Sequence, residues 1–122
     1  MLDTATLDAC AAELFAALGS RQGVAPLAAR LPGLSIDQAY RISLGLLARR
    51  EAAGEVVVGK KIGATSRAVQ ALLKTNQPDY GFLTDAMAFG EGQPIPISER
   101  LIQPRAEGEI AFVLKHDLAG PG

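Results

Sequence analysis

The chain has 122 residues, enough for one compact domain and too few for two of ordinary size. Its 48% hydrophobic residues, 20% charged residues and net charge of -1 are typical of a soluble globular protein, not of a disordered tail or a nucleic-acid-binding protein. The sequence contains no apolar run near the ~20 residues of a membrane-spanning helix and no secretory signal, so we expect a cytoplasmic protein that binds neither membranes nor nucleic acids.

The first predicted element is an amphipathic helix over residues 4–18. Asp3 or Thr4 is available as its N-cap, and Gly19 as its terminator. Cys10 lies on the apolar stripe of this helix. A single cysteine cannot form an internal disulfide, so we interpret it as a small core hydrophobe. Apolar residues at three- and four-residue spacing define the stripe: Leu7, Cys10, Ala11, Leu14, Phe15 and Leu18.

A connector and a second helix follow. Residues 22–33 contain two prolines and two glycines, which predicts a connector with one short turn at residues 27–30. Ser35 and Gln38 have the spacing of a capping box, so the second helix begins after Ser35. Gly54 is its predicted end.

Beyond Gly54 the pattern predicts strands. Three consecutive valines at residues 56–58 predict a strand that leads into a glycine-bounded polar segment at residues 59–63. Ser66 caps a short helix, and residues 76–79 have the composition of a turn. Further short strands are predicted at residues 80–84, 86–89 and 94–97.

Residues 107–114 predict a last, strongly apolar strand. Helices first and strands afterwards indicate an α+β fold, with a helical amino-terminal segment at residues 1–54 and the start of a β-rich domain at residues 55–122. An apolar strand needs cover on both faces, and almost nothing follows this one. We therefore expect an incomplete sheet.

Two acidic residues in this last strand are candidate metal ligands. On a strand, the side chains of Glu107 and Glu109 share one face. Carboxylate oxygens suit hard ions such as Mg²⁺ or Mn²⁺. Alternatively, both acids keep a solvent-facing strand edge from pairing. Spacing alone favours this alternative, because Glu-x-Glu is a common triplet.

Lys60, Lys61 and Asp79 are candidates for proton transfer. Neighbouring residues on a strand face opposite ways, so only one of the two lysines can point into a pocket. Asp79 follows a proline in a turn, where a carboxylate can act as a general base. By spacing alone, a solvated basic pair and an ordinary turn aspartate remain the favoured interpretations.

Three motifs in order change this weighting. Residues 58–66 read Val-Gly-Lys-Lys-Ile-Gly-Ala-Thr-Ser, residues 76–81 read Asn-Gln-Pro-Asp-Tyr-Gly, and residues 103–111 read Gln-Pro-Arg-Ala-Glu-Gly-Glu-Ile-Ala. Together they resemble the 2-keto-4-pentenoate hydratase and 4-oxalocrotonate decarboxylase family of the fumarylacetoacetate hydrolase superfamily. The resemblance runs from about Leu27 to Leu118. It implies that the chain is the incomplete amino-terminal part of a mixed β fold.

The resemblance assigns roles to four residues. Glu107 and Glu109 match two of the three acids that hold Mg²⁺ or Mn²⁺ in the family, Lys61 matches a lysine proposed to move protons, and Asp79 matches an acid/base aspartate. It assigns no substrate-binding residue. The implied activity is that of a hydro-lyase, which converts 2-hydroxypenta-2,4-dienoate (2-keto-4-pentenoate) to a 4-hydroxy-2-oxo acid in the aromatic meta-cleavage pathway.

Two departures from the family pattern matter. Gly108 stands where the family usually has alanine, and the family's third metal acid lies beyond Gly122, so we expect the chain alone to be inactive. Homo-oligomers are common in the family, so we expect one, with a partner enzyme of the same pathway as a further candidate.

Three alternatives stay open: decarboxylation by the same family, a non-catalytic assembly fragment whose exposed strand pairs with another copy, and acylpyruvate hydrolysis. The aspartate in the Gln-Pro-Asp motif favours the hydratase over the decarboxylase.

Overall fold

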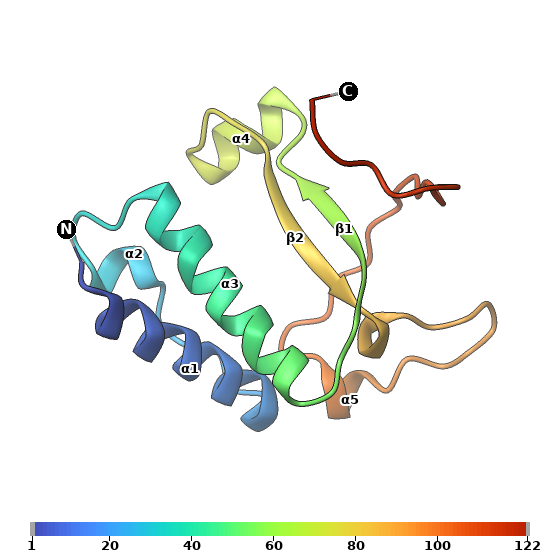
Figure 1. The fold of residues 1–122 in the computed structure, drawn as a ribbon, viewed down its shortest axis with the longest axis horizontal. Coiled ribbons are helices and arrows are strands. Elements are labelled where there is room, and N and C mark those ends of the chain that lie inside the picture. The colour runs from blue at the N-terminus through green and yellow to red at the C-terminus, as the bar shows by residue number, and fades with distance from the viewer. Residues whose placement is uncertain (1, 122) are drawn as a thin grey trace.

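The computed structural model describes residues 2–121 as three helices followed by a small sheet and an irregular carboxyl-terminal part. Figure 1 shows α1 beside α3, and β2 between α3 and β1. Helices thus precede strands, and the predicted α+β class is confirmed. The elements in chain order are α1 (Thr4–Ser20), α2 (Leu27–Arg30), α3 (Ile36–Ala52), β1 (Val57–Gly63), α4 (Arg67–Leu73), β2 (Asp79–Thr84), the 3-10 turn η1 (Asp85–Met87) and α5 (Ile97–Arg100).

Helix α1 begins as predicted and ends later than predicted. The carboxylate of Asp3 accepts a hydrogen bond from the Thr6 backbone N–H at 2.8 Å, and this bond holds the pKa of Asp3 below its usual value. The helix then passes through Gly19, so the prediction of Gly19 as terminator was wrong. Arg21 takes the left-handed C-cap conformation instead, and its guanidinium donates to the Ser98 carbonyl at 2.6 Å.

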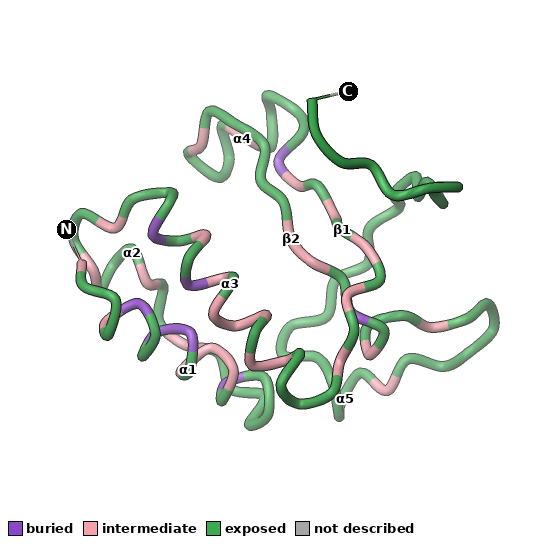
Figure 2. Tube along the Cα trace, viewed as in Figure 1, coloured by how far each residue is buried: buried purple, intermediate pink, exposed green. Residues whose placement is uncertain are grey.

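The hydrophobic core lies between α1 and α3. Leu7, Cys10 and Ala11 of α1 pack with Ile42 of α3, and Figure 2 shows the buried positions on these two helices. Cys10 is buried in this cluster, which confirms its interpretation as a core residue. The helices approach closely at Gly45, where an added Cβ would lie 2.8 Å from the Cβ of Ala11.

The short α2 and the start of α3 are held by the polar contacts of their termini. Arg30 donates to both carboxylate oxygens of Glu13 on α1, at 3.0 and 2.7 Å, and the guanidinium lowers the pKa of Glu13. Ser35 and Gln38 form the predicted capping box. The predicted turn at residues 27–30 and the helix after Ser35 are therefore confirmed.

The sheet consists of β1 and β2, paired antiparallel. We predicted that the first strand ends before the polar segment, and this was wrong. The strand runs to Gly63 because Lys60 pairs with Phe82 and Lys61 pairs with Gly81. The predicted strand at residues 80–84 is confirmed within β2.

Helix α3 is joined to β2 at both ends of the strand. Near the start of β2, the ring of Tyr40 stacks on that of Tyr80, with centroids 4.7 Å apart. At its end, Arg50 donates to Glu55 at 2.7 Å and to the fully buried hydroxyl of Thr84 at 3.2 Å. These contacts fix how the helix lies along the strand.

Three other predicted strands are absent from the structure. At residues 86–89, the Asp85 carboxylate accepts from the backbone N–H groups of Val56 and Ala86, which stabilises the turn η1 in place of a strand. Residues 94–97 lead without strand structure into α5.

Residues 107–114 are exposed and without strand structure. Within residues 2–121 no partner strand pairs with them, and an unpaired strand is not stable. None of the helices in the described part of the chain has the length and apolarity needed to cross a membrane.

Candidate functional site

Strand β1 directs Lys61 toward the interior of the molecule. Exposure alternates along the strand, with Lys61 half-buried and Lys60 exposed. The Lys60 ammonium lies 5.6 Å from the centroid of the Phe82 ring instead. The expectation that only one of the two lysines points inward is confirmed.

Asp79 lies near Lys61 because of the strand register. Asp79 is the first residue of β2 and pairs with Gly63. A Cβ placed on Gly63 would overlap the Asp79 carboxylate and would lie 2.9 Å from Lys61 Nζ. The aliphatic stem of Lys61 crosses Gly81, where an added Cβ would lie 3.6 Å from its Cγ and Cδ. Both charged groups therefore share the space beside Gly63, which two glycines leave open.

A cavity of about 460 Å³ contains this pair. Within residues 2–121, neither Lys61 nor Asp79 takes part in an ion pair, either with each other or with another charged group. An ammonium that can donate a proton and a carboxylate that can accept one therefore line the same cavity. The lining residues are Ala39, Tyr40 and Ser43 from α3, Lys61 from β1, and Asp79, Tyr80 and Gly81 from β2.

The helix wall of this cavity was missed by sequence reasoning. Ala39 and Ser43 lie within the helix predicted after Ser35, and no sequence rule states which strand a given helix face contacts. Tyr40 gave no signal of its own. The roles of Gly63 and Gly81 depend on the register of β1 against β2, which is a tertiary property.

The structure does not bring the predicted metal ligands to this cavity. Glu107 and Glu109 are exposed, carry no strand structure, and are absent from the lining among residues 2–121. In that same part of the chain, no group of three acidic, histidine or cysteine side chains is arranged to hold a metal ion. Two carboxylates supply donor atoms suited to a hard divalent cation, but only part of the six or more ligands that such ions take.

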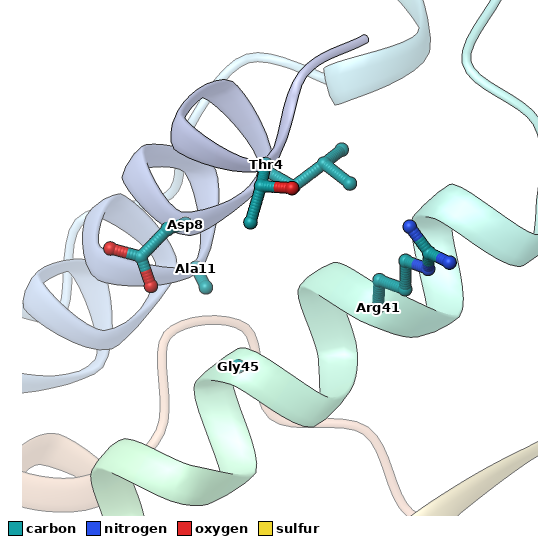
Figure 3. A pocket seen from close by; sticks show the side chains of 6 residues that line it. Thr4, Asp8, Ala11, Arg41 and Gly45 are labelled. Atoms are coloured by element: carbon teal, nitrogen blue, oxygen red, sulfur yellow. The ribbon is translucent and has the colours of Figure 1, made fainter. Parts of the chain in front are cut away.

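A second cavity of about 320 Å³ lies between α1 and α3. Thr4, Asp8 and Ala11 of α1 and Arg41 and Gly45 of α3 line it, and Figure 3 labels them on the two helices. The Asp8 carboxylate is already paired with Arg49 at 2.8 Å. This cavity contains none of the predicted site residues.

Relatives of this chain are hydratases. Over 121 residues the chain is 55% identical to 2-hydroxypent-2,4-dienoate hydratase of Pseudomonas putida, covering 99% of this chain and 54% of the relative. It is 50% identical to 2-hydroxyhexa-2,4-dienoate hydratase of Comamonas testosteroni, covering 100% of this chain and 47% of the relative. This chain is homologous to the 2-keto-4-pentenoate hydratases. The resemblance based on the three motifs is thereby confirmed, although no family model matches the chain.

A solved structure also has the same local fold as this chain. The 4-oxalocrotonate decarboxylase from Pseudomonas putida G7, complexed with magnesium and adipate, superposes with a TM-score of 0.67 and 29% identity. The superposition covers 70% of this chain and 33% of the decarboxylase. The same enzyme is also known complexed with calcium and acetate. This chain spans about half the length of the curated relatives it matches.

Proposed function

We propose that this chain supplies the proton-transfer residues of a metal-dependent hydratase that converts 2-hydroxypenta-2,4-dienoate to a 4-hydroxy-2-oxo acid in aromatic meta-cleavage catabolism. One observation carries the proposal: Lys61 Nζ and the Asp79 carboxylate both lie beside Gly63 and line one cavity. The hydratase names of relatives with 45–55% identity support the reaction class.

The pair has the groups that the reaction needs. Conversion of the dienol to a ketone removes the proton of the 2-hydroxyl group and adds a proton at C5. Water then adds its oxygen to C4 and a proton to C3. In the first exchange Asp79 accepts the hydroxyl proton and Lys61 donates a proton to C5. In the second exchange the roles reverse: Lys61 accepts a proton from the attacking water and Asp79 donates one to C3, which restores both groups.

We assign Glu107 and Glu109 as part of a site for Mg²⁺ or Mn²⁺, with the remaining ligands coming from water, substrate or residues outside this chain. A divalent ion bound there would stabilise negative charge on the substrate's C1 carboxylate and 2-oxygen. The decarboxylase structures, complexed with magnesium and with calcium, support a divalent cation.

The similarity to the decarboxylase also supports an assignment of the two parts of the chain. In this proposal, residues 1–54 form a helical amino-terminal segment, and residues 55–122 begin a mixed β domain of the fumarylacetoacetate hydrolase type. Met1 and Gly122 lie outside the residues that the structure describes.

The protein acts in the cytoplasm as a homo-oligomer, with a pathway enzyme as a further partner, and the chain alone is inactive.

A second candidate function is decarboxylation of 4-oxalocrotonate. The fold similarity with a TM-score of 0.67 favours it, because that neighbour is a decarboxylase. The hydratase remains the first candidate, because the hydratase from Pseudomonas putida is 55% identical to this chain and the decarboxylase 29%.

The test is a spectrophotometric assay of dienoate consumption with Mg²⁺ or Mn²⁺. It compares this chain with an extended version, which carries in addition the part of the Pseudomonas putida hydratase that the alignment leaves out. We expect turnover only in the extended version, and loss of it in Glu107→Gln, Glu109→Gln and Lys61→Met. 4-Oxalocrotonate is offered in parallel. Turnover of that substrate alone would favour the decarboxylase, and turnover of neither would contradict the proposal.

A further inference from the structure

Tyr40 links the helix wall of the cavity to the strand that carries Asp79. Its hydroxyl accepts a hydrogen bond from the Tyr80 backbone N–H at 3.4 Å. Its ring also stacks on the Tyr80 ring, with centroids 4.7 Å apart and planes 17° apart. Tyr80 in turn meets Phe82 edge-on at 5.9 Å. One side chain thus contacts both the backbone and the ring of the residue that follows Asp79.

This hydrogen bond gives a partner to a backbone N–H on the edge of β2 that β1 does not pair with. Figure 1 shows β2 between α3 and β1, and the sheet has only these two strands within residues 2–121. The N–H of an edge strand is otherwise left to water. The Tyr40 hydroxyl therefore stabilises β2 at its first residues, where Asp79 is located.

The helix that holds Tyr40 is itself fixed. Ile42, two residues further, is 2% exposed in the core against α1. At the far end of the helix, Arg50 is bound to Glu55 and Thr84. A side chain on a well-packed helix holds the strand end that it contacts in place more precisely than a side chain on a loop does.

We propose that Tyr40 is a positioning residue for the reaction: it anchors the start of β2 so that the Asp79 carboxylate stays beside Lys61. This role rests on the proposed function of that pair. Tyr40 acts through Tyr80 and Asp79, so its removal lowers the rate of proton transfer more than it weakens substrate binding.

Two variants separate the hydroxyl from the ring. Tyr40→Phe keeps the stacked ring and loses the hydrogen bond, whereas Tyr40→Leu loses both. In this chain, we expect the exchange rate of the Tyr80 amide, followed by NMR, to rise about fivefold in Tyr40→Phe and further in Tyr40→Leu. In the extended version, we expect kcat to fall about tenfold in Tyr40→Phe with KM nearly unchanged.

Ile42→Val is the matched control, because it removes one methyl group from the core beside α1 while the helix stays in place and both contacts of Tyr40 are kept. It should lower thermal stability, while the Tyr80 amide exchange and kcat stay at the wild-type values. An unchanged Tyr80 exchange rate in Tyr40→Phe would overturn the proposal, as would an unchanged kcat. If the wild-type extended version shows no turnover, the proposed function fails, and with it the catalytic role of Tyr40; the exchange rates then report only on the anchoring of β2.

Discussion

Two glycines, Gly63 and Gly81, leave the space in which Lys61 and Asp79 lie near each other. Gly81 leaves room for the stem of Lys61, and Gly63 leaves room for the ends of both charged side chains. Neither glycine has a positive φ, so the backbone there suits other residues as well. These glycines therefore matter for the room they leave beside them, and not for a backbone conformation that only glycine adopts.

Gly63→Ala should disable the pair without unfolding the protein. The added methyl group would overlap the Asp79 carboxylate and press on Lys61 Nζ, and both are free ends of flexible side chains that can move away. A displacement of about 1 Å costs on the order of a hundredfold in rate. We expect a loss of this size in dienoate turnover by the extended version, with the thermal midpoint nearly unchanged.

Gly59→Ala provides the matched control on the same strand. A Cβ at Gly59 would lie 3.8 Å from Leu83 Cδ1, which is ordinary van der Waals contact. This variant should retain wild-type turnover. Equal activities of the Gly63 and Gly59 variants would show that the space beside Gly63 is not where the reaction occurs.

Some of these residues could be predicted from sequence, and others could not. Alternation along a strand was enough to expect that one lysine of the pair points inward. The helical stripe was enough to place Cys10 in the core. The proton-transfer roles of Lys61 and Asp79 were expected only from a resemblance, because the proximity of the two residues depends on the pairing of Gly63 with Asp79. Tyr40 could not be found, since its partner lies 40 residues away in the chain.

At the scale of elements, the accuracy of the predictions follows the range of the interactions. Helices α2, α3 and α4 are set by contacts within one turn, such as the caps at Ser35 and Ser66, and they were predicted well. Strands need a partner distant in the chain. Residues 86–89, 94–97 and 107–114 have apolar composition without such a partner in the described chain, so composition alone misassigned them.

The packing of α1 on α3 gives a test at this scale. Gly45→Ala would place a Cβ 2.8 Å from that of Ala11, which is fully buried. Overpacking of this kind costs about 1–3 kcal/mol, which exceeds the gain of up to ~1 kcal/mol from replacing a helical glycine. We expect a lower free energy of unfolding, measured by chemical denaturation.

Two further variants separate packing from helix propensity. At Gly19, also within α1, no atom lies within 4 Å of an added Cβ, so Gly19→Ala should be neutral or stabilising. The double variant Ala11→Gly with Gly45→Ala exchanges the two residues across the contact and should recover most of the lost stability. A stabilised Gly45→Ala would mean that the helices separate easily, and the core between them would not be the main source of stability.

At the scale of the whole molecule, the carboxyl-terminal segment stands out because its apolar side chains are left exposed. Ile110, Phe112 and Val113 are 85%, 84% and 98% exposed, although they are strongly apolar. Contiguous exposed apolar residues mark a surface that is covered in the working protein. The curated relatives are about twice as long as this chain, and their additional length is the source of cover that we propose for residues 107–114.

This proposal predicts where hydrogen exchange changes when the chain is extended. In the chain alone, amides at residues 110–114 should exchange almost as fast as in an unstructured peptide, since they lack partners in the sheet. In the extended version they should slow by at least about a hundredfold. The Lys61 amide, within the paired β1, serves as the internal reference in both. Strong protection of residues 110–114 in the chain alone would instead mean that they pair between copies, and size-exclusion chromatography would then show an oligomer. That outcome would favour an assembly fragment over a part of an enzyme, because the strand that carries Glu107 and Glu109 would already be used in association.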